Sequence, residues 1–247
     1  AEGKISDLYA DEPFDRRLVS ICREDREIYK ELDIMYFRGR ASFEFLVNDN
    51  LLDMVEALVG PEITCSPIQH TRAKLPAEVT PEGSDPHVAP WHQDSGVTWE
   101  EADPHFILTI WLPLSPARPE NGCLQIIPRA HGGGMRQHHI KQGLGTVILD
   151  DEMPEQEPLT LPMDKGDVLL MHKQTPHRST ANNADVVRWS MDLRWNDARK
   201  PNGRPQLPGM LVRSVESPEL IVDDRQLWLA AWKLAQVSRR GAKLYRW

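Results

Sequence analysis

His92 and Asp94, in the segment Trp91-His92-Gln93-Asp94, have residue types and a spacing that could do chemistry. Side chains in a β-strand alternate between its two faces, so a His-x-Asp pair on a strand points both side chains to the same side. An imidazole and a carboxylate placed in this way could bind one metal ion. With nine histidines and 37 acidic residues in 247, about one such pair is expected by chance. Taken alone, the pair is more often an exposed polar turn.

His177 is the candidate for a third ligand from a distant part of the chain. Residues 168–171 follow the turn at Gly166-Asp167 and predict an apolar strand, and we expect His177 at the end of this strand segment. Two imidazoles and one carboxylate on one face of an iron(II) ion leave the opposite face open for oxygen. His172, in the same segment, is an alternative third ligand.

Arg188 lies eleven positions after His177, at the start of a second predicted strand. Because burying an isolated charge is costly, an arginine that points into a barrel needs a carboxylate partner. A guanidinium group binds a carboxylate through two parallel hydrogen bonds. That partner could be the distal carboxylate of 2-oxoglutarate or a protein acid such as Asp192. The alternation in this strand puts Trp189, Met191, Leu193 and Trp195 on one face, and Arg188, Ser190, Asp192 and Arg194 on the other.

The elements that must position these residues are helices followed by many short strands. This order argues against an alternating βαβ sheet and favours a jelly roll. Helical signals occur at residues 25–32 and 51–59, and Gly60-Pro61 ends the second. Strands are predicted at 63–73, 106–114, 123–127, 168–171 and 188–195, and loops at 75–90, 132–151 and 201–208.

The C-terminal part of the sequence predicts a closing amphipathic helix over residues 223–239. Its apolar face would carry Leu227, Ala230, Ala231 and Leu234. Trp228 and Trp232 share one side of the same helix, and we expect them in the core. The whole chain is predicted to form one domain, with a helical flank at 1–60, a β core at 61–200 and a C-terminal loop and helix at 201–247.

Composition excludes several classes of partner. The formal net charge of −8 argues against a nucleic-acid partner, which would meet a basic surface. The three cysteines are odd in number and far apart, which fits a reducing cytosol and no disulfide framework. No apolar run approaches the roughly 18–20 residues of a membrane span, and the first residues are polar. We therefore expect a cytoplasmic protein with small-molecule partners, and the sequence gives no indication of an oligomeric state.

The sequence resembles the phytanoyl-CoA dioxygenase family over residues 60–195. The motifs occur in the family's order and near its spacing. They are Gly60-Pro61, Trp91-His92-Gln93-Asp94, Thr109-Ile110-Trp111-Leu112-Pro113-Leu114, Glu120-Asn121-Gly122-Cys123-Leu124, Pro128-Arg129-Ala130-His131, Gly166-Asp167 and the segment from His177 to Arg188.

The resemblance implies a mostly β fold with flanking helices, namely the double-stranded β-helix (a cupin-like jelly roll). It implies iron(II) held by His92, Asp94 and His177, with oxygen and 2-oxoglutarate as co-substrates. Arg188 would bind the distal carboxylate of 2-oxoglutarate, and the sixteen positions between His172 and Arg188 would depart from the family. Other residues whose motif positions suggest the co-substrate pocket are Ser179, Ser190, Trp111, Gln69, Thr109 and Lys74.

The implied activity is hydroxylation with release of succinate and carbon dioxide. Related halogenases have a small residue at the position of Asp94, so the carboxylate predicts hydroxylation and not halogenation. The candidates for substrate contacts are Arg194, Trp99 and Lys74, and we hypothesise a small metabolite that could carry negative charge. One alternative is a jelly-roll metalloenzyme that does not use 2-oxoglutarate, and another is a non-catalytic binding protein on the same fold.

Three further features bear on these predictions. Arg178 stands where the family often has glycine, next to His177. The N-terminal strand and helix usual in the family are not evident in the sequence. Of the remaining histidines, we expect a structural role for His131 and solvent-exposed loop positions for His138 and His139.

Overall fold

The computed structural model describes residues 3–80, 88–141, 145–238 and 246. A major sheet has the order β11-β1-β10-β3-β8, and β2 also pairs with β10. A small sheet has the order β7-β4-β9, and β5 and β6 form a hairpin. The major sheet consists of β1 (Ile63–Cys65), β2 (His70–Lys74), β3 (Ile107–Pro113), β8 (Leu169–His172), β10 (Arg188–Asp197) and β11 (Met210–Arg213). The other strands are β4 (Leu124–Ile126), β5 (His138–Lys141), β6 (Gly145–Ile148), β7 (Leu159–Leu161) and β9 (His177–Ser179).

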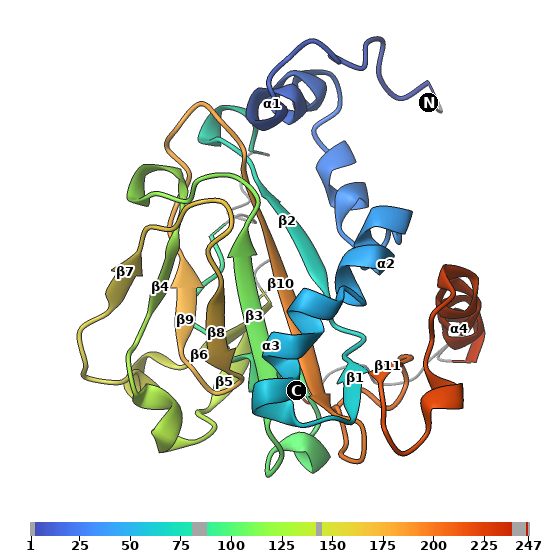
Figure 1. Ribbon diagram of the computed structural model, residues 1–247. Coiled ribbons are helices and arrows are strands. Elements are labelled where there is room, and N and C mark those ends of the chain that lie inside the picture. The colour runs from blue at the N-terminus through green and yellow to red at the C-terminus, as the bar shows by residue number, and fades with distance from the viewer. Residues whose placement is uncertain (1–2, 81–87, 142–144, 239–245, 247) are drawn as a thin grey trace.

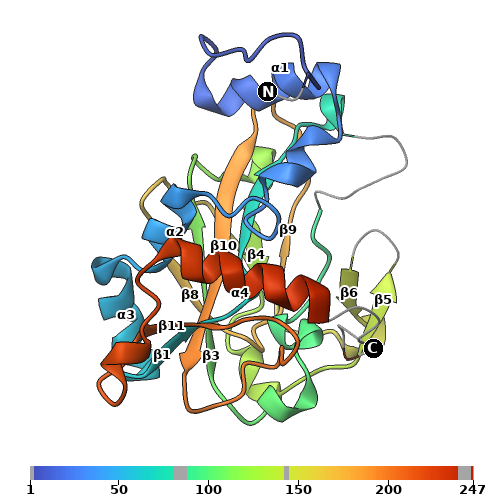
Figure 2. The same cartoon turned by 90° about the vertical axis from the view of Figure 1, so that its right-hand side faces the viewer.

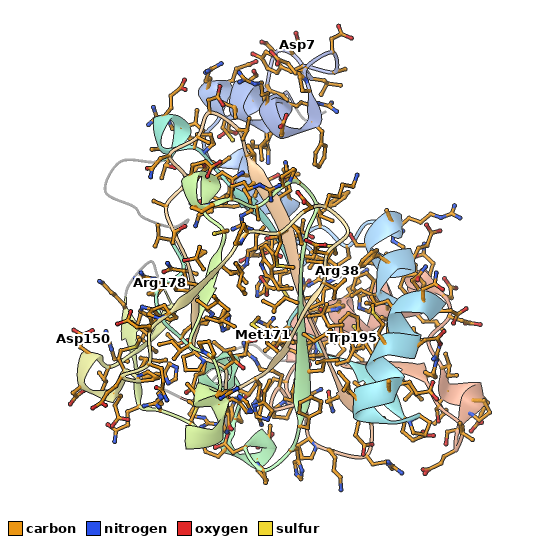
Figure 3. All side chains as sticks on the ribbon, turned by 60° about the vertical axis from the view of Figure 1, so that its left-hand side comes forward. Asp7, Arg38, Asp150, Met171, Arg178 and Trp195 are labelled. Atoms are coloured by element: carbon orange, nitrogen blue, oxygen red, sulfur yellow. The ribbon has the colours of Figure 1, made fainter. Side chains whose placement is uncertain are left out.

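The longest strand, β10, organises the major sheet. Its Trp189, Met191, Leu193 and Trp195 belong to apolar clusters packed against the helices. Figure 3 shows Trp195 on the helix side of this sheet and Met171, from β8, on the side of the small sheet. The predicted alternation of β10 is confirmed, and it leaves the even-numbered side chains facing the space between the two sheets.

In the described ranges four α-helices accompany the sheets, and Figure 1 shows α2, α3 and α4 on one side of the major sheet with the small sheet on the other. They are α1 (Phe14–Glu24), α2 (Arg40–Leu46), α3 (Asp49–Val59) and α4 (Arg225–Ser238). Trp228 and Trp232 of α4 are buried, and in Figure 2 this helix crosses in front of β10. Two sheets with helices outside one of them confirm the predicted jelly roll.

Several predicted elements are confirmed by the structure. The helix at 51–59 corresponds to α3, which ends at Gly60 with a φ of 96°, a value that favours glycine. The strands predicted at 106–114, 123–127 and 168–171 correspond to β3, β4 and β8 within one or two residues at each end.

Other predictions about the elements were wrong. Residues 63–73 form two strands and not one, because 66–69 turn away between β1 and β2. Residues 25–32 contain only a short 3-10 helix, Ile28–Leu32, whereas α1 and α2 were not predicted. Within the loop predicted at 132–151, β5 and β6 form a hairpin; residues 142–144 lie outside the described part. The predicted loop at 75–90 includes residues 81–87, which also lie outside it.

The C-terminal region differs from the prediction in two respects. β11 pairs with β1, so the segment 201–247 contributes a strand as well as a loop and helix. In α4, Leu227 and Leu234 are exposed, while Trp228 and Trp232 face the core. The two apolar stripes lie side by side on the helix, and the larger tryptophan side chains remove more apolar surface from water. Residue 239, the predicted helix end, lies outside the described residues.

Candidate metal centre

His92, Asp94 and His177 come together as the sequence predicted. One ligand atom from each lies within 4.8 Å of the other two, and Asp94 and His177 are buried. His177 is the first residue of β9, and it forms an antiparallel bridge with His92. The main-chain N–H of each histidine donates to the carbonyl of the other, at 3.1 and 3.0 Å. This backbone pairing brings the two imidazoles to 4.2 Å between ring centroids.

Both imidazoles are oriented by the main chain. Nδ1 of His92 lies 2.8 Å from the Pro90 carbonyl, and Nδ1 of His177 lies 2.9 Å from the Thr175 carbonyl. A carbonyl oxygen only accepts, so Nδ1 carries the proton and Nε2 keeps its lone pair for a metal ion. Burial, reinforced by the neighbouring His177 ring, lowers the pKa of His92 to about 3. His92 is therefore a neutral imidazole at physiological pH, the form that binds metals.

The Asp94 carboxylate is held at both of its oxygens. Nη2 of Arg194 donates to Oδ1 at 2.6 Å, and Oγ1 of Thr109 donates to Oδ2 at 2.6 Å. Burial opposes ionisation, but Arg194 and the two imidazoles outweigh it and hold the pKa of Asp94 below its usual range. Asp94 is thus a fixed, ionised carboxylate. Two imidazoles and one carboxylate match the donor set of mononuclear iron(II) sites.

Arg188 is a buried cation on the same face of β10 as Arg194. It is 4% exposed, and Nη1 donates to Oγ of Ser190. Its guanidinium lies 5.4 Å from the centre of the Trp111 ring. Nε has no hydrogen-bond partner, and no acid in the described part of the chain forms an ion pair with Arg188. Burial lowers the pKa of Arg188 to about 10. This site fits an anionic ligand, which would supply the missing acceptors.

Asp192, the protein acid weighed as a partner of Arg188, has other partners. Its Oδ1 accepts from Nη1 of Arg194 at 3.0 Å, and its Oδ2 accepts from Nε of Arg72 at 3.0 Å. The internal ion pair that could have satisfied Arg188 is therefore not formed in the structure.

Lys74 lies beside Arg188, because the two residues are register partners in β2 and β10. Its ammonium group donates to Oγ of Ser179 at 2.8 Å, and that oxygen also accepts from the main-chain N–H of Ala89. Gly122 makes room for the lysine, since a Cβ at this position would lie 2.1 Å from Lys74 Cε. Lys74, Ser179 and Ser190 therefore gather with Arg188 and Trp111 in one polar cluster.

Two predicted site residues have surroundings that the sequence did not reveal. Gln69 uses both amide hydrogens on main-chain carbonyls, those of Ser66 and Arg194, at 2.8 Å each. Arg194, a predicted substrate contact, is bound to Asp94 and Asp192 and offers no free guanidinium fork to an anionic substrate. Trp99 lies five residues past Asp94, and its main-chain N–H donates to the carbonyl of Gly203.

The remaining histidines lie apart from the candidate metal ligands. His172 ends β8, and its ring packs against those of Phe106 and His131, so it is not part of the triad. His177 begins a new strand, and the expectation that it ends the apolar strand was wrong. His138 is buried in β5, where Nε2 accepts from the main-chain N–H of Gln93 at 3.1 Å, which corrects its predicted loop position. His139 is exposed.

Arg178 points away from its neighbour His177, as alternation in β9 requires. Its guanidinium lies 4.8 Å from the centre of the Trp91 ring, and Nε donates to Gln125 at 2.7 Å. Figure 3 shows Arg178 on the small sheet. An arginine at this position therefore does not fill the metal centre.

Sequence reasoning missed the charged residues behind Asp94. The alternation of β10 did place Asp192 and Arg194 on the side of Arg188, and this was the available signal. What the pattern could not show is that β3 sets Thr109 directly beside Arg194, through the register of the two strands.

Comparison with known proteins agrees with this arrangement. The chain is 28% identical to a phytanoyl-CoA dioxygenase domain-containing protein 1 of Danio rerio, over 53% of this chain and 43% of the relative. It spans less than half the length of several of the curated relatives that it matches. In the described residues, none of the helices combines the length and apolar character needed to cross a bilayer.

Two solved structures share the fold. One is the non-heme monooxygenase ThoJ in its apo form, with a TM-score of 0.67 and 19% identity over 91% of this chain and 84% of that chain. The other is the epimerase SnoN in complex with Fe3+, alpha ketoglutarate and nogalamycin RO, with a TM-score of 0.56 and 18% identity over 75% and 76%. The family model for phytanoyl-CoA dioxygenase matches residues 25–190. This match covers more than half of the chain, which therefore belongs to the phytanoyl-CoA dioxygenase family.

Proposed function

We propose that the protein is an iron(II)- and 2-oxoglutarate-dependent dioxygenase that hydroxylates a small molecule. The observation that carries this proposal is the buried Arg188, which forms no ion pair with any described acid and lies in the same barrel interior as a complete His-Asp-His triad. A metal site alone would not require such a cation, whereas a dicarboxylate co-substrate would use it. The fold and the family support the same proposal.

The triad residues would hold the iron. His92 and His177 would bind it through Nε2, because Nδ1 of each is occupied by a main-chain carbonyl. Asp94 would complete the set as an ionised carboxylate. When bound, iron(II) would supply oxygen activation coupled to decarboxylation of 2-oxoglutarate, giving succinate, carbon dioxide and a hydroxylated product.

The polar cluster beside the triad would bind and orient the co-substrate. Arg188 would form two parallel hydrogen bonds with the distal carboxylate. The hydroxyl of Ser190 already accepts a hydrogen bond from Arg188, and the hydroxyl of Ser179 accepts one from Lys74. Trp111 would form one wall, since it is buried and its ring lies next to the Arg188 guanidinium. Gln69 is not part of this proposal, because its amide hydrogens are used by the main chain.

Hydroxylation, and not halogenation, is proposed because Asp94 is present and is held in place. A negative charge on the substrate is not part of this proposal, because Arg194, the expected contact for it, is paired with protein acids. Trp99 as a substrate contact, the domain boundaries and a cytoplasmic location stay predictions.

An anaerobic titration tests the proposal. Iron(II) and 2-oxoglutarate are added to the protein, and the weak visible charge-transfer band of the chelated co-substrate is followed in wild type, Arg188→Met and His177→Ala. We expect a band in wild type, a much weaker one in Arg188→Met and none in His177→Ala. Iron binding without a band would instead indicate a metalloenzyme that does not use 2-oxoglutarate. Failure to bind iron would indicate a non-catalytic protein.

A further inference from the structure

The guanidinium of Arg194 has three hydrogen-bond partners, one of which is Asp94. Nη1 donates to Oδ1 of Asp192 at 3.0 Å and to the carbonyl of Ile68 at 3.3 Å, and the other prong of the fork, Nη2, donates to Asp94. The residue is 6% exposed. Burial would lower its pKa, but the two carboxylates outweigh burial and raise the pKa above the ordinary value. The guanidinium therefore stays charged and is a rigid link between two acids.

The main chain of Arg194 is fixed as well, by Gln69. β1 pairs with β10 up to Trp195 and β2 pairs with β10 up to Asp192, so Arg194 faces the gap between these two strands, where Ser66 donates its main-chain N–H to the Arg194 carbonyl at 2.9 Å. The carboxamide of Gln69 fills this gap. Its Oε1 accepts from the N–H of Arg194 at 3.0 Å, and its Nε2 donates to the carbonyl of Arg194 at 2.8 Å. The first takes the place of a hydrogen bond that a neighbouring strand would supply, and the second adds to the one that Ser66 already donates to the same carbonyl.

Thr109 holds the other oxygen of Asp94 from the next strand. It is the register partner of Arg194 across β3 and β10, it is 1% exposed, and its hydroxyl lies 2.6 Å from Oδ2. The carboxylate plane is thus set by a donor on each oxygen, and the donors come from adjacent positions on two paired strands.

We propose that Arg194 and Thr109 are positioning residues for the metal ligand Asp94, with Gln69 holding the main chain of Arg194 in place. The proposal rests on the metal site proposed above. Their role is to fix the direction in which the carboxylate presents its remaining lone pairs. Partners of this kind, which bind a ligand and not the metal, typically change metal affinity by about 10- to 100-fold when removed.

The alternative is that Arg194 only neutralises buried acids, and the two roles predict opposite signs. A positive charge next to a ligand repels a divalent ion, so its removal should by charge alone strengthen metal binding. If Arg194 positions Asp94, its removal should instead weaken metal binding, because the carboxylate is free to turn. Thr109 is neutral, and charge alone predicts no change when only its hydroxyl is removed.

The test is calorimetric titration of the purified protein with Ni2+, a probe that is insensitive to oxygen. We expect the Kd of Arg194→Met to rise by about 10- to 100-fold and that of Thr109→Val by about tenfold. Arg194→Lys keeps the charge but loses the fork, and its Kd should fall between those of wild type and Arg194→Met. Unchanged or tighter binding in Arg194→Met, or an unchanged Kd in Thr109→Val, would overturn the proposal.

Two controls keep the outcome interpretable. His177→Ala removes one of the proposed ligands. If wild type binds Ni2+ no better than this variant, the metal site itself is disproved. That outcome differs from a failure of the positioning role, in which wild type binds Ni2+ and the Arg194 and Thr109 variants bind it equally well. Circular dichroism of each variant shows whether it is folded. Should Arg194→Met fail to fold, Thr109→Val decides alone, since valine has nearly the same shape as threonine. The visible spectrum of bound Co2+ gives a second readout: a changed band shape in Thr109→Val is expected, and an unchanged one counts against the proposal.

Discussion

Replacing Arg188 with methionine is expected to make the metal-free protein more stable and, at the same time, unable to bind 2-oxoglutarate. Burial lowers the pKa of Arg188 from 12.5 to about 10. At neutral pH the guanidinium is charged in both the folded and the unfolded chain. The folded protein therefore bears the full cost of burying the charge, about 3 kcal/mol at ~1.4 kcal/mol per pKa unit. Stacking on Trp111 and the hydrogen bond to Ser190 return about 2 kcal/mol. Methionine fills a similar volume, which leaves a net gain of about 1 kcal/mol.

Thermal unfolding measured by circular dichroism at pH 7 tests the stability. For a chain of this length, the gain corresponds to a rise in Tm of about 2–4 °C in Arg188→Met. Added 2-oxoglutarate should raise the Tm of the Ni2+-loaded wild type and leave that of the loaded variant unchanged. Arg178→Met is the matched control, since Arg178 stacks on Trp91 outside the polar cluster and its loss should not affect the response to 2-oxoglutarate. A Tm that falls by several degrees in Arg188→Met, together with a retained response to 2-oxoglutarate, would refute the reasoning.

Two further substitutions test the packing around the site. Gly122→Ala should lower the free energy of unfolding by about 3 kcal/mol, because φ is 87° and the new Cβ would collide with the buried Lys74. Gly132→Ala is the control in urea unfolding, since a Cβ at this position would have no neighbouring atom within 4 Å. Burial lowers the pKa of Lys173 to about 8, below its usual 10.5, so the unfolded chain holds this proton more tightly. Wild type should therefore gain stability between pH 8 and pH 10, by up to about 3 kcal/mol, and urea unfolding of Lys173→Met should show no comparable gain.

The parts of the site that the sequence predicted are those encoded by local period and spacing. β10 was predicted correctly because alternate residues are apolar over its length, and that period also placed Arg188, Asp192 and Arg194 together. The choice of His177 over the nearby His172 came from the resemblance to the family, from which a spacing of sixteen positions to Arg188 would depart. For β10, the deciding information lies within a short stretch of the chain.

The parts that were missed depend on contacts between distant residues. The side chain of Gln69 binds the main chain of Arg194 in the gap between β1 and β2, and no pattern in residues 63–73 reveals that break. The hairpin β5–β6 was read as a loop, because three consecutive glycines precede it, at 132–134. In α4 the sequence predicted both the tryptophan stripe and the leucine stripe in the core; Trp228 and Trp232 are buried as expected, and only packing against the sheet shows that Leu227 and Leu234 are exposed.

The division of β10 into an odd-numbered core face and an even-numbered site face also bears on how this scaffold can diversify. A substitution at Ser190 or Asp192 changes the interior of the barrel and leaves the helix packing as it is. The insertion or deletion of a single residue within β10 would instead exchange the faces on one side of the change, turning either Arg188 toward the apolar core or Trp195 toward the candidate metal centre. Descendants of this fold are therefore expected to conserve the length of this strand while its alternate positions vary, and to accept changes of length only in the loops.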